Sequence, residues 1–278
     1  MLNWLSYGVV NISKYMTPLI FAVAIAAWFL VLKKYIPVKK NHRILIKVAV
    51  ASCVGAGLSP LLIIIFSGKF VSFLSSSMTK IQKINDWNAF QALLAVLFKG
   101  FSITGGLLIL TIVLLFVVHD ARKLIFGIFY PFPLFAAITR INCFMEGCCF
   151  GKISEGPCAI KYPPASHASK LHHLKHGLIS RFEVSYPVHP VQAYLVISML
   201  LLFIILFIMN RFNVRRNIIA GTMLAGYGMI NFNMEFLRVE PLLYNFLTVG
   251  QIMEILITAL GFYIIFKVRD CDIKENLK

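Results

Sequence analysis

The stretch 130-YPFPLFAAITRINCFMEGCCFG-151 decides how this chain folds and where its chemistry lies. It begins as an apolar run interrupted by Pro131 and Pro133, and it ends in a dense group of polar and small residues. An arginine, a glutamate, thiols and glycines at the end of a hydrophobic run are unusual for a packing element. In a membrane protein, ionisable residues in such a position indicate a functional site. We therefore expect the rest of the chain to hold this stretch at a defined membrane depth.

Composition places the chain among multi-span membrane proteins. Of its 278 residues, 59% are hydrophobic and 14% are charged, and the mean hydropathy is +0.81. Soluble domains are about half apolar and about a quarter charged. The net charge of +16 comes from Lys and Arg clustered between apolar runs, which is typical of loops facing anionic lipid headgroups rather than of a nucleic-acid patch.

The pattern of apolar runs predicts an all-α, polytopic fold that forms a single integral membrane domain over residues 1–278. About seven transmembrane helices are expected, at about 17–32, 44–66, 103–118, the opening stretch, 191–209, 218–236 and 248–266. The longest polar insert, residues 152–188, is expected to form a small extracytoplasmic head over the membrane surface.

Short loops set the predicted orientation. Segments 33–43, 119–123 and 211–216 are compact and basic, with Asp120 as their only acid. The positive-inside rule makes such loops cytoplasmic. Seven spans then place the N-terminus and the head outside, and the C-terminus in the cytoplasm.

Arg140 is the first candidate for chemistry. Placing its guanidinium in hydrocarbon costs about 3 kcal/mol, and a bidentate contact with a phosphate gives a reason for that cost. The structural alternative is a snorkelling arginine that anchors a helix end. Nearby Gly147 and Gly151 favour the ligand interpretation, because glycines let a ligand approach the backbone closely.

A second polar face is predicted on the 218–236 helix. Tyr227, Asn231 and Glu235 follow one another at intervals of four residues, so they share one helical face. A phenol, an amide and a carboxylate on one face indicate a lined cavity rather than lipid contact. The alternative is an ion pair of Glu235 with Arg140 or Arg238, and such a pair can also position a functional arginine.

The cysteines between residues 143 and 158 lie near several histidines, of which His172 and His176 are spaced for one helical face. Vicinal cysteines share one tetrahedral site with difficulty, and no CxxC pair is present. We therefore expect neither a metal nor another cofactor. A disulfide involving Cys158 is favoured over a metal, and small thiols packed in a tight turn are favoured most.

The motif HPVQAY at 189–194 opens the 191–209 span. Pro190 and Tyr194 fit a helix start at a membrane interface. That interpretation leaves His189 and Gln192 without an explanation.

Several of these residues recur together in one family. Arg140, Gly147 and Gly151 are followed by HPVQAY at 189–194, Tyr227-Gly228, EFLR at 235–238 and Gly250-Gln251. In this order and spacing the chain resembles the prolipoprotein diacylglyceryl transferases over about residues 100–255. The segment CFMEGCCFG at 143–151 is similar to a subgroup of that family.

The resemblance implies a multi-pass enzyme of the bacterial cytoplasmic (inner) membrane. Such an enzyme transfers the diacylglyceryl group of phosphatidylglycerol to the lipobox cysteine of prolipoprotein signal peptides, within membrane lipid, and releases glycerol phosphate. The catalytic residues that the resemblance implies are Arg140, Glu235, Tyr227 and His189. The implied substrate-binding residues are Gly147, Gly151, Gln192, Tyr194, Arg238, Gln251, Thr104 and Asn231.

Some positions depart from the usual family pattern. Thr104 stands where the family has a histidine proposed as a base, and Asn231 stands where it has a second arginine. Cys143 and Cys148 replace an asparagine and a glutamate, and Leu195 replaces a further glutamate. Two other functions therefore stay open: a transferase with another lipid donor or acceptor, and a lipid-binding or transport relative without this activity.

Overall fold

The computed structural model of the chain describes residues 103–116, 122–176, 183–238 and 247–275. Within these ranges the regular structure is helical and no strand forms, which confirms the all-α prediction. The helices are α5 (Ile103–Phe116), α6 (Arg122–Phe129), α7 (Phe132–Glu146), α8 (His167–His176), α9 (Val191–Arg211), α10 (Arg216–Glu235) and α11 (Val249–Glu275). The spans predicted at 17–32 and 44–66 lie outside the described residues, so the total of seven stays a prediction.

Three helical stretches in the described ranges are long and apolar enough to cross a membrane: Phe126–Glu146, Val191–Arg211 and Val249–Lys267. They lie at three of the predicted spans. The helix α10 occupies the predicted span at 218–236 but is not among the three, since its polar face lowers its hydropathy. The described part of the 103–118 span, α5, has 14 residues. It is about 21 Å long, less than the roughly 30 Å of a hydrocarbon core.

The opening stretch is not one helix from its first residue. The helix α6 ends at Phe129 and α7 begins at Phe132, with Pro131 as its N-cap and a further proline in its first turn. Proline lacks an N–H group and has a fixed φ, so it fits the first turn of a helix and interrupts a helix interior. The candidate span therefore begins in α6, at Phe126, rather than at the predicted Tyr130.

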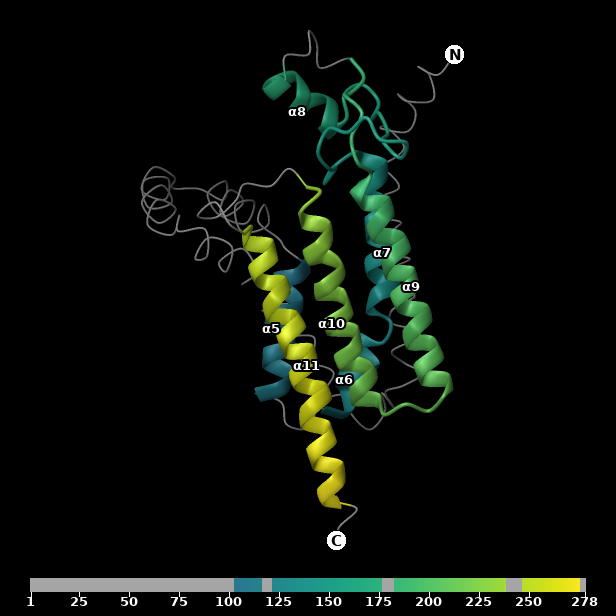
Figure 1. The fold of residues 1–278 in the computed structure, drawn as a ribbon, viewed down its shortest axis with the longest axis vertical. Helices are drawn as coiled ribbons and strands as arrows, with labels where there is room; N and C mark the ends of the chain where they lie inside the picture. The colour runs from purple at the N-terminus through teal and green to yellow at the C-terminus, as the bar shows by residue number, and fades with distance from the viewer. Residues whose placement is uncertain (1–102, 117–121, 177–182, 239–246, 276–278) are drawn as a thin grey trace, which may run out of the picture.

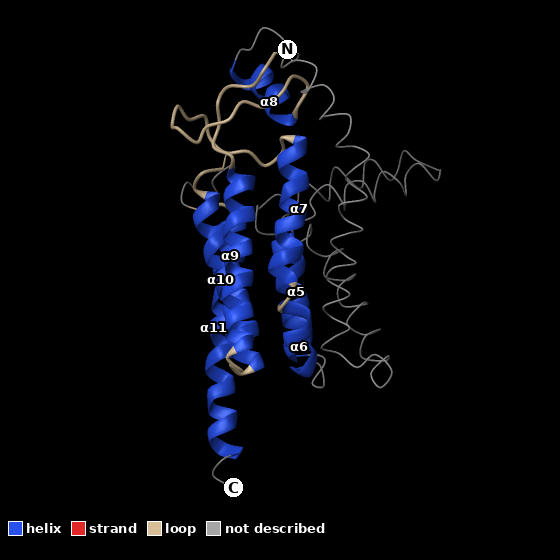
Figure 2. Ribbon diagram, turned by 90° about the vertical axis from the view of Figure 1, so that its right-hand side faces the viewer, coloured by secondary structure: helices blue, strands red, loops and turns tan. Residues whose placement is uncertain are grey.

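The helices form two layers, with α9, α10 and α11 on one side and α5, α6 and α7 on the other (Figure 2). In the first layer α10 lies between α9 and α11, and α7 packs against α9 across the layers (Figure 1). The contact of α10 with α11 is close, because a Cβ at Gly228 would lie 2.6 Å from the Glu254 carbonyl oxygen. Small residues allow this approach between helices in a membrane.

Residues 147–176, which include α8, and residues 183–190 lie over one end of the bundle, beyond the upper ends of α7 and α9 in Figure 1. They enclose a small core of Phe150, Tyr162, Ala168 and Val188. Gly151 pairs with Arg238 in an isolated antiparallel bridge, and the Lys152 N–H donates to the Leu237 carbonyl at 2.7 Å. The predicted head is therefore tied to the end of α10 by its backbone.

The charged segment from Lys267, beyond the predicted span at 248–266, continues α11 as far as Glu275. Lysine, arginine and glutamate are good helix formers, so a helix can extend beyond its apolar part. At the opposite end of the bundle from the head, α11 projects past its neighbours (Figure 1).

Candidate functional site

Arg140 lies on α7 and is half-buried. Its guanidinium forms no hydrogen bond or ion pair with another described residue. Its positive charge acts on Tyr227 of α10, on Glu254 of α11 and on Cys149. The guanidinium therefore lies close enough for its charge to act on side chains of two other helices.

The predicted polar face of α10 is buried. Tyr227, Asn231 and Glu235 are 2%, 5% and 7% exposed. The Tyr227 hydroxyl lies 3.4 Å from the Thr104 hydroxyl of α5. The Asn231 amide donates to the Tyr227 carbonyl at 2.8 Å, so this amide group is engaged by its own helix. The three side chains therefore do not face lipid.

Glu235 has two partners at the end of α10. Its Oε2 forms an ion pair with Arg238 Nη1 at 2.9 Å, and its Oε1 accepts a hydrogen bond from the Thr248 hydroxyl at 3.2 Å. Of the two ion pairs that the sequence left open, the structure forms the one with Arg238. The charge of Arg140 is thus not neutralised by direct contact with Glu235.

Glu254 is a member of the site that the sequence analysis did not select. It is 4% exposed, and its Oε2 accepts no hydrogen bond from the described part of the chain. The charges of Glu235, Arg238 and Arg140 all act on it. The sequence feature that could have identified Glu254 is a single carboxylate inside an apolar span. We call Arg140, Tyr227, Glu235, Arg238 and Glu254 the polar cluster.

Gln192 connects the head to the loop after α7. It is fully buried, accepts a hydrogen bond from the Tyr162 hydroxyl at 3.0 Å and donates to the Cys148 carbonyl. Nearby, His189 Nδ1 lies 3.5 Å from the Tyr194 hydroxyl. The HPVQAY motif thus holds the start of α9 against the loop that carries the cysteines.

For three residues predicted to bind substrate, contacts within the protein explain why that residue type stands at the position. Gly147 ends α7 in the left-handed region at φ 63°, and a Cβ there would lie 3.0 Å from the Tyr162 ring. A Cβ at Gly151 would lie 2.8 Å from the Leu237 carbonyl oxygen. Gln251 and Thr248 cap the start of α11 reciprocally. Their predicted contacts with substrate stay predictions.

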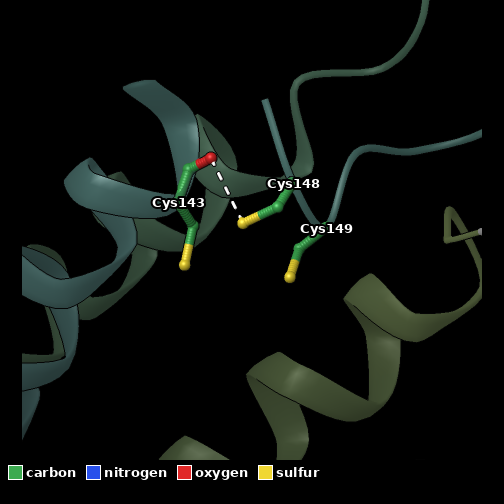
Figure 3. Close-up of side chains that lie close together, drawn as sticks. All are labelled: Cys143, Cys148 and Cys149. Atoms are coloured by element: carbon green, nitrogen blue, oxygen red, sulfur yellow. Dashed lines mark hydrogen bonds between the residues drawn. The ribbon is translucent and has the colours of Figure 1, made fainter. Parts of the chain in front are cut away.

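The sulfur atoms of Cys143, Cys148 and Cys149 all lie within 4.8 Å of one another. We call these residues the cysteine trio. Cys143 is in the last turn of α7 and the other two follow it, and Figure 3 shows the three sulfurs projecting into the same space. The backbone conformation explains why the three sulfurs lie close together, because Cys149 has a left-handed φ of 56° shortly after the left-handed Gly147. The Cys148 thiol also donates to the Cys143 carbonyl at 3.6 Å.

The trio has an unusual electrostatic environment. Hydrogen bonds with the Cys143 and Cys148 thiols lower the pKa of Cys149 well below its usual value, and the charges of Arg238 and Arg140 act in the same direction. The hydrogen bond with the Cys143 thiol raises the pKa of Cys148. Three sulfurs within 4.8 Å of one another, with the charges of Arg140 and Arg238 acting on Cys149, form a soft ligand set.

The other interpretations of the cysteines and histidines can now be compared with the structure. Cys158 is exposed and forms no disulfide with another described cysteine, so the disulfide suggested for it is not formed there. His172 is buried in the head, where its Nδ1 accepts the Tyr186 N–H at 3.1 Å. Within the described ranges, no histidine joins the cysteine trio as a metal-ligand group.

A groove of about 480 Å³ lies between α10 and α11 on their outer side. It is lined by Met229, Phe232, Asn233, Ile255, Thr258, Ala259 and Phe262. None of the polar cluster or the cysteine trio contributes to it, so this groove is separate from the candidate site.

Comparison with known proteins gives one consistent family. The sequence model for prolipoprotein diacylglyceryl transferase matches residues 4–267. A phosphatidylglycerol–prolipoprotein diacylglyceryl transferase of Aeromonas hydrophila is 28% identical over 183 residues, which cover 60% of this chain and 59% of that protein. The protein of the same name from Buchnera aphidicola is 27% identical over 245 residues, covering 82% and 80%. The chain thus spans less than two thirds of the first relative's length.

Proposed function

Because this chain belongs to the prolipoprotein diacylglyceryl transferase family, we propose that it transfers the diacylglyceryl group of phosphatidylglycerol to the lipobox cysteine of a prolipoprotein signal peptide. The family is a bacterial membrane transferase family, and the apolar helices of this chain fit it. In the proposed reaction the acceptor sulfur attacks the glyceryl carbon that carries the phosphate. The carbon–oxygen bond breaks, its electron pair stays with the phosphate, and glycerol phosphate leaves.

The observation that carries this proposal is the state of Arg140. A half-buried guanidinium without a described hydrogen-bond partner is costly unless it meets a charged ligand. A phosphate satisfies it by two parallel hydrogen bonds. As the carbon–oxygen bond breaks, negative charge grows on the phosphate, and a preorganised positive charge stabilises that transition state.

The other members of the polar cluster support Arg140. Glu235 holds Arg238 in place, so that Arg238 offers a second, partly neutralised guanidinium at the end of α10. The Tyr227 hydroxyl, which lies 3.4 Å from the Thr104 hydroxyl, would donate a hydrogen bond to the phosphate or the glycerol. Glu254, buried on α11, lies within range of the Arg140 charge.

We further propose the predicted orientation in the bacterial cytoplasmic membrane, with the N-terminus and the head outside and the C-terminus in the cytoplasm. The basic turn between α9 and α10 lies at the end of the bundle opposite the head (Figure 1), which agrees with the positive-inside rule. The polar cluster then lies toward the outer leaflet. A signal peptide and phosphatidylglycerol both reach that level of the membrane.

A second function is favoured by one observation. Thr104, near the Tyr227 hydroxyl, cannot serve as the base that the family's usual histidine is proposed to be. A lipid-binding relative without transferase activity would keep Arg140 for the headgroup and need no base. It would bind phosphatidylglycerol and release no glycerol phosphate.

The deciding experiment compares the unmodified protein with Arg140→Ala in membranes supplied with phosphatidylglycerol and a lipobox peptide. We expect lipidation and glycerol phosphate release to fall by about 100-fold or more, the scale of losing a charge-stabilising donor. Arg211→Ala, on the exposed last turn of α9, is the matched control and keeps activity. Undiminished lipidation by Arg140→Ala would sink the proposal. Bound lipid without glycerol phosphate in the unmodified protein would establish the lipid-binding function instead.

A further inference from the structure

We propose that the cysteine trio is the site of a divalent, thiophilic metal ion of the zinc class, and that the open coordination position of this ion takes the acceptor thiol. The metal site stands on the arrangement of Cys143, Cys148 and Cys149, whereas its catalytic role rests on the proposed function. Nothing in the family comparison suggests a metal. The proposal comes from three sulfurs that converge at the end of α7.

The sulfurs are spaced so that small shifts of the side chains would allow all three to bind one ion. Zinc binds thiolate sulfur at about 2.3 Å, so two sulfurs on a tetrahedral zinc are roughly 3.8 Å apart. The three sulfurs of the trio lie within 4.8 Å of one another. A shift of about half an ångström per sulfur, within the range of small side-chain rotations, would bring all three to bonding distance.

The backbone of the loop is shaped to bring these sulfurs together. Vicinal side chains normally diverge, which is the reason that the sequence argues against a shared site. Cys149 is in the left-handed region at φ 56°, which costs a non-glycine residue about 1–2 kcal/mol. Such strain is concentrated at functional sites. The fully buried Gln192 holds the loop from outside through the Cys148 carbonyl, as a supporting shell does in metal sites.

The number of ligands points to a reactive rather than a structural site. In the described part of the chain, no histidine or carboxylate joins the trio, so the described residues supply three protein ligands. Structural zinc sites have four, whereas catalytic sites have three and an open position. Three thiolates and a divalent ion carry a net charge of about −1. The charges of Arg140 and Arg238, which act on Cys149, offset it.

A bound zinc ion would supply the activation of the acceptor thiol that the proposed reaction requires. A free thiol has a pKa near 8.5, whereas a thiol that coordinates a zinc ion is deprotonated. The acceptor thiol would lose its proton to water on binding the ion, and its sulfur would attack the glyceryl carbon. The carbon–oxygen bond would break with its electrons passing to the phosphate, and no redox change is required. Metal binding would thus activate the thiol where Thr104 cannot.

Arg140 and Cys143 are three residues apart on α7, so they lie next to each other on one face of that helix. The phosphate at Arg140 and the thiolate at the metal would be held side by side. This placement is what a direct displacement between sulfur and glyceryl carbon requires.

The first test measures metal in the full-length protein, purified in detergent with a reductant and without chelators. We expect about one zinc per chain by elemental analysis. After metal removal, Co²⁺ should bind in the same ratio with thiolate-to-cobalt charge-transfer absorption. Cys143→Ser and Cys149→Ser should each reduce metal to background, while Cys158→Ser, an exposed cysteine outside the trio, should retain it.

The second test uses the cobalt-loaded protein and a lipobox peptide. Binding of the peptide thiol would raise the charge-transfer absorption by about one third, as three thiolates become four. A peptide with serine in place of the lipobox cysteine should leave the spectrum unchanged. An unchanged spectrum with the cysteine peptide bound would overturn the acceptor role.

The outcomes separate this inference from the proposed function. Normal lipidation by a protein that binds neither Zn²⁺ nor Co²⁺ would overturn the metal site and leave the transferase function intact. The unmodified protein is titrated directly, so this result does not depend on a variant that fails to fold. One bound zinc per chain without lipidation of any acceptor would sustain the metal site and overturn the proposed function.

Discussion

Arg140 and Arg238 both belong to the polar cluster, but they differ in what surrounds them. Arg238 is paired with Glu235 at 2.9 Å, whereas Arg140 has no such pair among the described residues. A paired guanidinium is held in place and partly neutralised, while an unpaired one retains its full charge for a ligand. In the proposed function, Arg238 would therefore be a positioning residue and Arg140 would bind the phosphate.

Glu235→Gln tests the positioning role. Loss of the carboxylate charge leaves Arg238 without its ion pair, and we expect the protein to lose about 1–3 kcal/mol of stability. Lipidation should fall by about 10-fold through a lower kcat, since Arg238 would no longer be aligned. Thermal unfolding in detergent and the lipidation assay measure the two effects.

Glu155→Gln, in the exposed part of the head, is the matched control and should change neither quantity. If Glu235→Gln lost stability but kept the kcat of the unmodified protein, the ion pair would have a structural role only.

At the scale of elements, the close contact of α10 with α11 determines where Glu235 and Glu254 lie in the bundle. Gly228 and Gly261 remove the side chains that would hold the helices apart, and Glu254 then lies directly against α10. The break between α6 and α7 has a similar effect on the other layer. Arg140 and Cys143 are three residues apart near the end of α7, so they lie on one face of that helix.

Gly228→Leu should separate α10 from α11. A Cβ at this position would meet the Thr258 hydroxyl and lie 2.6 Å from the Glu254 carbonyl oxygen, so the backbones must move. Overpacking of this kind costs about 1–3 kcal/mol. We expect a lower unfolding temperature and loss of lipidation, measured on the same purified sample.

Met229→Leu changes the next residue on α10, which is exposed on the outer side of the helix. It should leave the unfolding temperature within the error of the measurement. Equal stability of Gly228→Leu and the unmodified protein would show that the helices do not meet as closely as the structure has them.

At the scale of the whole molecule, the head and the basic α9–α10 turn lie at opposite ends of the bundle (Figure 1). Next to the head, Gln192 of α9 holds the loop that carries the cysteines, and Gly151 pairs with Arg238 through the backbone. Substrates would therefore meet the chemistry at the head end of the membrane domain.

Labelling of Cys158 tests the orientation. This thiol is exposed in the head, so a membrane-impermeant maleimide should label it in spheroplasts without permeabilisation. Cys158→Ser should lose that label. Arg211→Cys in the Cys158→Ser protein, at the other end of the bundle, should be labelled only after permeabilisation. The reverse pattern would invert the proposed topology.

The sequence by itself determined the features that depend on short-range spacing. The apolar runs predicted helices at 191–209, 218–236 and 248–266, and the structure has helices at each. The four-residue interval of Tyr227, Asn231 and Glu235 predicted a shared face, and all three side chains are buried. Helical periodicity is local, so a single stretch of sequence is enough to reveal it.

Only the tertiary structure decided which side chains meet between elements. Glu235 pairs with Arg238 rather than Arg140, and the close approach at Gly228 brings the Glu254 backbone of α11 against α10. The left-handed backbone at Cys149 brings adjacent thiols together, although sequence favours their divergence. Contacts between segments far apart in the chain depend on helix packing and on a few unusual backbone angles. Neither of these produces a repeating pattern in the sequence from which it could be predicted.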